Sequence, residues 1–340
     1  MIHLAIIGVG WAGQRQVEAI RELNRKAIVE CLVDKDAAFL ANKAAELGIS
    51  KTYCDLEEAL TDPVVDAVSI CTPHQLHRPM AVLAAAKKKH ILVEKPIAMT
   101  VEDATCMIEA AEANGVKLYV AENLCYTPLA RFLRTVVQTG QYVGELTAAS
   151  FTSGFQARQF GYPGRRVWLT IPEQGGTGTW MLHGIHSIAQ LRYILGEVER
   201  VYLREHHARS FERPDIEGTM SGLLTMESGI HVSVLQTCET HLAGRLAGYT
   251  LYGDQGTLRA WKTGAEVHRA DHEPLSITFD PAPLSEYAEE IEAFADYVAG
   301  ESVGPTTGIS ERRSLAVVQA GYESAASGQP IYLKARFNPL

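Results

Sequence analysis

The sequence lacks long hydrophobic runs and any surplus of positive charge. None of its apolar segments approaches the roughly 20 residues that a membrane-spanning helix needs. It contains 31 Lys and Arg against 40 Asp and Glu, which gives a formal net charge of −9. General binding to a nucleic-acid backbone requires clustered Lys and Arg, so this acidic balance argues against it. We expect neither a membrane nor a nucleic acid as partner, whereas small-molecule ligands are compatible with this composition.

Closely spaced cysteines are also missing, because none of the six forms a C-x-x-C pair. They are Cys31, Cys54, Cys71, Cys106, Cys125 and Cys238. Wide spacing of this kind predicts thiols rather than disulfides, most of them buried, in the reducing cytoplasm. The first eight residues are apolar but lack a basic region, and we expect a buried strand there rather than a signal peptide.

Short apolar runs alternate with stretches of helical periodicity over the first 120 residues. Candidate strands cover residues 2–7, 27–33, 66–71, 90–93 and 117–121. Alternation of strands and helices is typical of a parallel sheet with helices on both faces. The N-terminal part is therefore predicted to be an α/β domain.

The pattern changes near residue 123, where strand signals begin to dominate. Apolar and polar side chains alternate over residues 230–234, as in a strand that is covered on one face. Two helical segments finish the chain, and the Glu289-Glu290 pair on the first indicates a solvated helix face. We predict an α/β dinucleotide-binding domain over residues 1–122 and an α+β domain for substrate binding and oligomerisation over residues 123–340.

A glycine-rich motif, G-V-G-W-A-G, follows the first candidate strand and opens a helix. Its candidate cofactor-binding residues are Gly8, Gly10, Trp11, Ala12 and Gly13. In this context the first glycine permits a tight turn, the second admits a pyrophosphate, and the third lets the helix pack on the strand. The helix N-terminus then offers N–H groups to the phosphates. A Rossmann site for a dinucleotide is the favoured interpretation, and a glycine-rich surface turn is the alternative.

Asp34 ends the second candidate strand, where a carboxylate accepts hydrogen bonds from the adenosine ribose hydroxyls. A carboxylate there also repels a 2′-phosphate, which favours NAD over NADP. Lys35 follows directly and partly offsets that repulsion. We therefore expect NAD as cofactor, with NADP possible.

Further motifs make the sequence resemble a known family. C-T-P-H-Q-L-H covers residues 71–77, and E-K-P covers residues 94–96. A W-x-x-x-P segment from Trp168, a glycine cluster and G-I-H ending at His186 follow in the second half. Together they resemble the glucose–fructose oxidoreductase / inositol dehydrogenase / rhizopine-catabolism (Gfo/Idh/MocA) family of NAD(P)-dependent oxidoreductases. The resemblance implies a Rossmann domain followed by a domain with an open, mostly antiparallel sheet, which commonly joins subunits into homodimers or homotetramers.

The resemblance also implies residue roles. The lysine of E-K-P falls on Lys95, a catalytic residue near the nicotinamide, and the histidine of G-x-H falls on His186, the usual proton-transfer partner. A lysine acts as a base near neutrality when burial or a neighbouring cation lowers its pKa. Further cofactor-site candidates are Thr72, Pro73, His77, Glu94 and Glu122. Substrate-site candidates are Asn123, Tyr126, Arg165, Trp168 and His183.

Some of these candidates have a second explanation. The guanidinium of Arg165 and the aromatic face of Trp168 suit a sugar-like or carboxylated substrate, but a surface loop with an anchoring tryptophan explains them equally well. The i, i+3 spacing of His183 and His186 suits a metal ion. No cysteine or carboxylate cluster completes such a set, so no metal is predicted.

The sequence departs from the family pattern at two positions. The family commonly has an Asp four residues before the catalytic histidine, and this chain has Leu182 there. The usual basic residue in the segment after Asn123 is replaced by Cys125. A leucine neither orients an imidazole nor accepts a proton, so either another group supports His186 or Lys95 dominates the proton transfer.

The main functional hypothesis is an enzyme that moves a hydride between nicotinamide and a secondary alcohol or ketone of a sugar, cyclitol or similar polyol. A dihydrodiol dehydrogenase of the same family is an alternative enzyme. A non-catalytic dinucleotide-binding regulator is the alternative from another class, and the presence of both Lys95 and His186 argues against it.

Overall fold

The protein is described from a computed structural model, which covers residues 1–23, 26–154, 168–169, 171–175, 178–207, 216–242 and 244–338. By contacts, the chain divides into two compact units. Unit 1 comprises residues 1–123, 173–175 and 283–312, and unit 2 comprises residues 124–172, 176–282 and 313–340. The domain boundary expected at residue 122 stays a prediction. Residues 283–312, which are far along the sequence, pack with the N-terminal part in unit 1.

Unit 1 is built on a parallel sheet of six strands. They are β1(Ile2–Ile7), β2(Ala27–Val33), β3(Thr52–Tyr53), β4(Ala67–Ile70), β5(His90–Glu94) and β6(Leu118–Ala121). Their order is β3-β2-β1-β4-β5-β6, and every neighbouring pair is parallel. This is the strand order of a dinucleotide-binding Rossmann fold, whose ligands bind at the carboxyl ends of the strands.

The helices of unit 1 begin and end where the sequence supplies caps. They are α1(Trp11–Glu22), α2(Ala37–Leu47), α3(Leu56–Thr61), η1(His74–Leu76), α4(His77–Ala86), α5(Val101–Asn114) and α8(Glu286–Ala299). The Asp36 carboxylate accepts from Phe39 N at the start of α2, and Gly48 ends that helix with a φ of +64°. The Thr100 hydroxyl accepts from Asp103 N at 3.1 Å at the start of α5.

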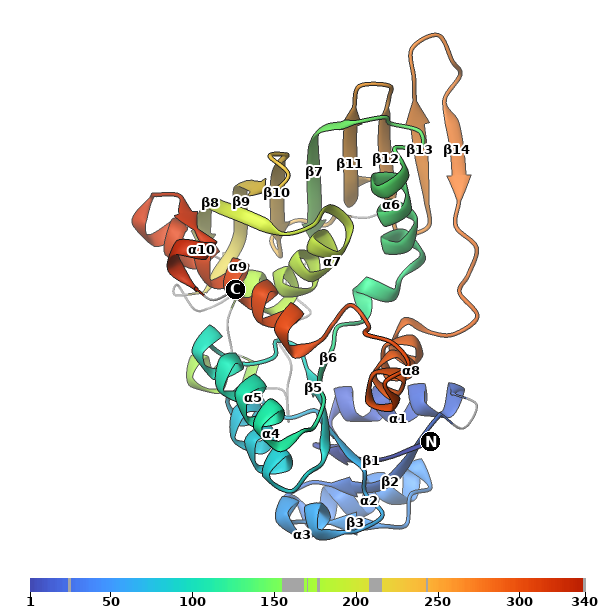
Figure 1. Cartoon of the computed structure of the whole chain (residues 1–340), viewed down its shortest axis with the longest axis vertical. Coiled ribbons are helices and arrows are strands. Elements are labelled where there is room, and N and C mark those ends of the chain that lie inside the picture. The colour runs from blue at the N-terminus through green and yellow to red at the C-terminus, as the bar shows by residue number, and fades with distance from the viewer. Residues whose placement is uncertain are drawn as a thin grey trace. The chain divides into compact units, whose positions relative to one another are not determined.

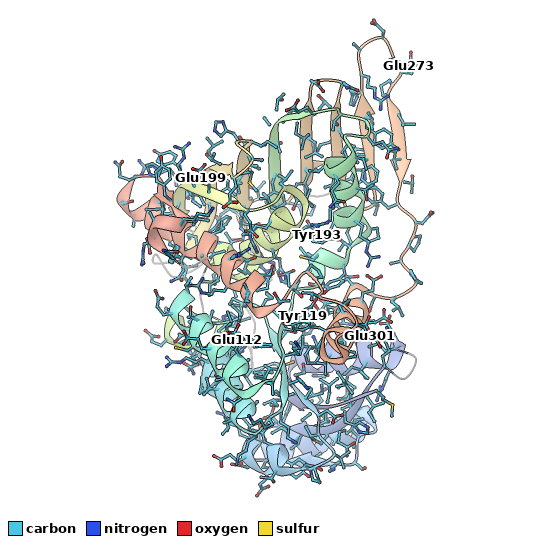
Figure 2. All side chains as sticks on the ribbon, viewed as in Figure 1. Glu112, Tyr119, Tyr193, Glu199, Glu273 and Glu301 are labelled. Carbon is cyan, nitrogen blue, oxygen red and sulfur yellow. The ribbon has the colours of Figure 1, made fainter. Side chains whose placement is uncertain are left out.

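Helix α8 lies beside α1 in unit 1, although more than 260 residues separate them in the sequence (Figure 1). Tyr119 on β6 is labelled in Figure 2. Its ring centroid lies 6.1 Å from that of Phe294 and 5.7 Å from that of Tyr297, both on α8. Phe294 and Ile291 are fully buried with the apolar face of α1. Helix α8 is therefore part of the hydrophobic core of the Rossmann unit.

Unit 2 is built on a sheet of nine strands. They are β7(Leu146–Gly154), β8(Val198–His207), β9(Glu217–Met226), β10(His231–Thr237), β11(Gly248–Gly253), β12(Thr257–Trp261), β13(Gly264–His268), β14(Leu275–Thr278) and β15(Ile331–Tyr332). The order is β14-β13-β12-β11-β7-β10-β9-β8-β15, and within the described part of this sheet only β7 and β10 pair in parallel. The expectation of an open, mostly antiparallel sheet is confirmed.

The remaining helices include those that pack on the nine-stranded sheet. They are η2(Asn123–Tyr126), α6(Pro128–Thr139), η5(Pro172–Gln174), η6(Trp180–Gly184), α7(Ile185–Leu195), η7(Gly244–Leu246), α9(Gly308–Ser327) and α10(Leu333–Arg336). Helices α6 and α7 lie side by side (Figure 1). The Tyr249 hydroxyl of β11 donates to Gln190 Oε1 of α7 at 2.9 Å, and the Trp180 indole donates to Val318 O of α9 at 3.0 Å. These buried contacts anchor η6 and α7 within unit 2.

Two properties of the whole chain were expected from the sequence. All six cysteines lie in the described part and none forms a disulfide, but only Cys31, Cys125 and Cys238 are buried, so the expectation that most are buried was wrong. Cys54 is exposed and lies in the short connection between β3 and α3. Within the described ranges, no helix combines the length and apolar character that crossing a membrane requires.

Candidate active site

The glycine loop between β1 and α1 encloses an open position. Gly8 has a φ of +85°, and a Cβ there would lie 2.7 Å from the Cys71 carbonyl oxygen. A Cβ at Gly13 would collide with the Gly8 carbonyl oxygen. A Cβ at Gly10 would meet none of the described atoms within 4 Å. The first and third glycines are therefore required by the fold itself, and the second borders a space that a pyrophosphate fits.

Helix α1 begins at this space. Trp11 and Ala12 occupy its first turn, where backbone N–H groups have no partner within the helix and bind anions well. The Trp11 side chain is 51% exposed, and the Arg15 guanidinium lies 5.6 Å from its ring. Gln14 donates to the carbonyl oxygens of Val9 and Gly10 and so fixes the loop that precedes the helix.

Asp34 lies at the carboxyl end of β2 and is bonded to the glycine loop. Its Oδ2 accepts from Val9 N at 3.2 Å, and its Oδ1 accepts from Asp36 N at 3.1 Å. The side chain is buried, whereas Lys35 beside it is exposed. The carboxylate is therefore held beside the loop, in the place where a ribose acceptor is needed.

His77 joins two turns at the carboxyl ends of β4 and β5. Its Nδ1 lies 3.0 Å from Pro96 O, and its Nε2 lies 3.0 Å from Thr72 O. Burial lowers the pKa of His77. A neutral imidazole carries one N–H and so donates to one of these oxygens. Thr72 and Pro73 are partly exposed in the first of the two turns, and His77 contacts the backbone beneath them.

Lys95 follows β5 directly, and two carboxyl groups influence its charge. Burial lowers the pKa of Lys95 from its ordinary 10.5, while the charges of Glu94 and Glu122 oppose this shift. Glu122 follows β6, the neighbouring strand, and is fully buried. Burial raises the pKa of Glu94 to about 7, and its carboxyl group accepts a hydrogen bond from the Lys95 backbone N–H. The carboxyl edge of the sheet thus carries an amine that loses its proton more easily than an ordinary lysine.

Sequence reasoning missed two residues of this cluster, Gln16 and Glu290. Gln16 Nε2 donates to Glu94 Oε1 at 3.3 Å and to Glu290 Oε1 at 3.0 Å. Glu290 is 1% exposed, so the expectation of a solvated face at Glu289-Glu290 was wrong for this residue. Its side chain lies on the face of α8 that packs against α1. The glutamate in an otherwise apolar face was the available signal, but the partner helix was not evident from the sequence.

Within unit 2, His183 and His186 lie on either side of a helix junction. His183 belongs to the π-helical turn η6 and His186 to the first turn of α7, with ring centroids 6.4 Å apart. Both are partly exposed, whereas Leu182 is buried. The turn is anchored by Glu217, whose Oε1 accepts from Trp180 N at 2.8 Å. Single π-turns often occur at functional sites.

Of the other candidates for the substrate site, Asn123 belongs to unit 1, whereas Tyr126 and Trp168 belong to unit 2. Asn123 ends the first segment of unit 1 and is buried. Tyr126 is buried in unit 2, as is the neighbouring Cys125. Trp168 is partly exposed, and its carbonyl oxygen accepts from Ile171 N at 3.0 Å. Arg165 lies outside the described residues. Across the described ranges, no three His, Cys, Asp or Glu side chains gather as metal ligands.

Comparisons with known proteins agree with this geometry. A family model described as "Oxidoreductase family, NAD-binding Rossmann fold" matches residues 2–122, and the "GFO/IDH/MocA C-terminal domain" matches residues 131–259. The chain is 29% identical over 293 residues to 1,5-anhydro-D-fructose reductase of Ensifer adhaerens, covering 84% of this chain and 85% of that protein. It is 29% identical to D-xylose 1-dehydrogenase (NADP(+)) 2 of Haloferax volcanii, covering 96% and 98%.

A solved structure shows the same fold. The crystal structure of aldose-aldose oxidoreductase from Caulobacter crescentus, complexed with glycerol, matches with a TM-score of 0.85 and 23% identity, covering 97% of this chain and 99% of that one. The two family models together match well over half of the sequence, with the glycine loop in the first. The chain therefore belongs to the GFO/IDH/MocA family of oxidoreductases, with an NAD-binding Rossmann fold in its N-terminal part.

Proposed function

We propose that the protein transfers a hydride between NAD(P) and a secondary alcohol or ketone of a sugar, cyclitol or similar polyol. The observation that carries this proposal is Lys95, an amine with a lowered pKa at the carboxyl edge of the Rossmann sheet. The named relatives support the substrate class, since one reduces an anhydro-sugar and another oxidises D-xylose.

The residues present fit a dinucleotide. Gly10 and the first turn of α1 would hold the pyrophosphate, and the Asp34 carboxylate would accept from the ribose hydroxyls. Thr72 and Pro73 would line the nicotinamide end, with Glu94 and Glu122 behind them. When bound, this cofactor supplies the acceptance or donation of a hydride.

Lys95 is proposed as the principal acid and base. Oxidation of a carbinol removes a hydride from carbon and a proton from the hydroxyl group, and the neutral amine at Lys95 Nζ takes that proton. In the reverse direction the ammonium form returns the proton to the carbonyl oxygen. A lowered pKa supports this role, because it brings the neutral amine closer to working pH.

His186 is proposed as a second proton-transfer group, and its partly exposed ring at the start of α7 supports this role. Substrate contacts are proposed for the remaining candidates of the family motifs. They are Asn123, Tyr126, Arg165, Trp168 and His183. With no carboxylate at position 182, Lys95 is expected to contribute more to proton transfer than His186.

We also propose that copies of the chain associate as a homodimer or homotetramer through the nine-stranded sheet. Tyr202, Leu223 and Tyr252 are 37–41% exposed on one face of this sheet, where the register places Tyr202 opposite Leu223. Exposed apolar side chains on one sheet face support an interface. A cytoplasmic location is proposed because six cysteines without a disulfide suit a reducing compartment.

A substrate panel tests the proposed function. Purified protein is incubated with NAD or NADP and with sugars, cyclitols or dihydrodiols, and reduced nicotinamide is followed by its absorbance. We expect turnover with at least one sugar or cyclitol. Turnover confined to dihydrodiols would overturn the substrate class. Cofactor binding without turnover across the panel would instead favour a non-catalytic regulator.

A further inference from the structure

A continuous set of contacts joins helix α8 to the backbone of Lys95. Glu290 on α8 accepts from Gln16 on α1 at 3.0 Å, and the same amide nitrogen donates to Glu94 at 3.3 Å. Glu94 in turn accepts from the backbone N–H of Lys95. One end of this chain of contacts is the backbone of Lys95, whose side-chain amine is proposed for proton transfer, and the other end is on helix α8.

We propose that Glu290, acting through Gln16, is a positioning residue that holds the Glu94 carboxyl group against the backbone of Lys95. This inference rests on the proposed function, in which Lys95 is the acid and base. Neither Glu290 nor Gln16 is placed in contact with the substrate or the cofactor. Their role is to fix the orientation and the charge of the group that lies behind the lysine.

Because this cluster is buried, we expect at most one of Glu94 and Glu290, the two acids bridged by Gln16, to be charged. Gln16 and Glu290 are 0% and 1% exposed, and a buried charge is costly unless it is paired. Among the described residues, Gln16 Oε1 and Glu290 Oε2 have no hydrogen-bond partner. A carboxylic acid that keeps its proton removes one of the charges and provides a donor for the neighbouring acceptors. The geometry thus favours a resident proton on Glu290.

The neighbouring charges agree with that assignment. Burial together with Glu94 and Glu122 raises the pKa of Glu290 well above its ordinary value. Glu286 on its own helix acts in the same direction, and burial together with Glu290 raises the pKa of Tyr287 to about 12. Cys71 after β4 also interacts with Glu290, Arg15 on α1 interacts with Tyr287, and Lys95 after β5 interacts with Glu94. Burial raises the pKa of Cys71 and lowers the pKa of Lys95.

The contact through Gln16 affects Lys95 in a predictable direction. The Gln16 hydrogen bond lowers the pKa of Glu94, and the Glu94 charge raises the pKa of Lys95. Loss of the Gln16 amide therefore raises the Glu94 pKa, keeps Glu94 neutral to higher pH and lowers the Lys95 pKa. The acid limb of kcat/KM for alcohol oxidation, which requires neutral Lys95, is then expected to move to lower pH.

Infrared spectroscopy tests the resident proton without relying on catalysis. Folded wild-type protein and Glu290→Gln are compared at pH 8 in the carbonyl-stretch region of protonated carboxylic acids. We expect a band in the wild type that the variant lacks. If the spectrum of Glu290→Gln keeps the same band as the wild type, the assignment of the proton to Glu290 is overturned.

Kinetics test the positioning role. Gln16→Met and Glu290→Leu each remove the amide–carboxyl contact, and we expect about a tenfold to hundredfold loss of kcat, as for a small misplacement at a reacting centre. KM for NAD is expected to stay within about twofold, and the acid limb of Gln16→Met moves to lower pH. Glu290→Gln, which resembles the neutral acid, is expected to keep kcat within about threefold.

Glu292→Gln is the matched control, because it makes the same Glu-to-Gln substitution on the same helix, at a residue that is paired with Lys26 at the surface. It is expected to behave as the wild type. Wild-type kcat and pH profile in both Gln16→Met and Glu290→Leu would overturn the positioning role. Loss of kcat in Glu290→Gln as large as in Glu290→Leu would overturn the neutral acid. Near-normal turnover in Lys95→Ala would instead refute the proposed function, while the infrared result would stand.

Discussion

At the residue scale, Asp34 and Lys95 show how the Rossmann framework prepares single side chains. The Asp34 carboxylate is held in place by two backbone N–H groups, so its direction is set before a ribose arrives. Lys95 is prepared in the opposite way, since burial destabilises its charged form and two carboxyl groups limit that effect. One residue is oriented for recognition and the other is tuned for proton transfer.

Cofactor preference is the first prediction at this scale. Asp34→Ala removes both the ribose acceptor and the charge that repels a 2′-phosphate, so the ratio of kcat/KM for NAD over NADP should fall about tenfold. Asp34→Asn is the control, because it keeps the size of the side chain and an acceptor oxygen and removes only the charge. The measurement is initial rates with both cofactors. A wild-type preference for NADP would show that the exposed Lys35 or another cation outweighs Asp34.

Position 182 carries the second prediction. Leu182→Asp restores the carboxylate that the family commonly has, and an anion near His186 should raise the pKa of the imidazole. If His186 acts as a base, the acid limb of kcat/KM should then move to higher pH. Leu182→Asn has the same size without the charge and serves as the control. Equal profiles for the two variants would mean that the side chains at 182 and 186 do not meet.

At the element scale, the turns at the carboxyl ends of β1, β4 and β5 form the site of unit 1. The first depends on glycine, the second and third are joined by His77, and helix α1 presents its N-terminus to the first. Each turn follows a short buried strand, so its position is set by the sheet register. The site therefore follows from the order of the strands as much as from the motifs.

The glycine loop yields a prediction about binding without loss of fold. Gly10→Val places a side chain in the open position, so affinity for NAD should fall at least about a hundredfold, while the melting temperature changes little. Gly10→Ala, with a smaller side chain, should lose less. Isothermal titration and circular dichroism measure the two properties. Unchanged NAD affinity in a folded Gly10→Val protein would remove the loop from the cofactor site.

Sequence patterns located many elements because local rules determine them. The expected strands at 2–7 and 27–33 agree with β1 and β2. Strand β3 has two residues and α3 has six, which is too short for a periodic signal. The burial of Glu290 depends on the packing of α8 against α1, and no local pattern encodes that long-range contact.

At the scale of the whole molecule, the Rossmann unit is assembled from both ends of the sequence. Residues 283–312 complete its core, since α8 buries Ile291 and Phe294 with residues of α1 and β6. The motifs for the cofactor nevertheless lie within residues 2–122, where the family model ends. Sequence motifs thus mark the site, whereas the compact unit includes a helix that the motif pattern does not contain.

A truncation tests this feature. A fragment of residues 1–122 lacks α8 and exposes Tyr119, Ile20 and their apolar neighbours, which are buried in the full chain. Exposing several buried side chains costs about 1.5–3 kcal/mol each, and together this is a large share of the free energy of unfolding of an ordinary domain. We expect the fragment to be largely unfolded at 25 °C in circular dichroism. A cooperative melting transition like that of the full chain would show that α8 is dispensable.

The pH dependence of kcat/KM for alcohol oxidation in wild type and Lys95→Ala, with NAD affinity measured alongside, tests the role of Lys95 most directly. We expect a wild-type acid limb below the ordinary lysine pKa of 10.5, because burial favours the neutral amine and rising pH produces it. Lys95→Ala should lose that limb and about 10²–10⁴-fold in kcat, while NAD affinity changes little. Near-normal turnover in Lys95→Ala, with the same acid limb, would contradict the assignment of proton transfer to Lys95.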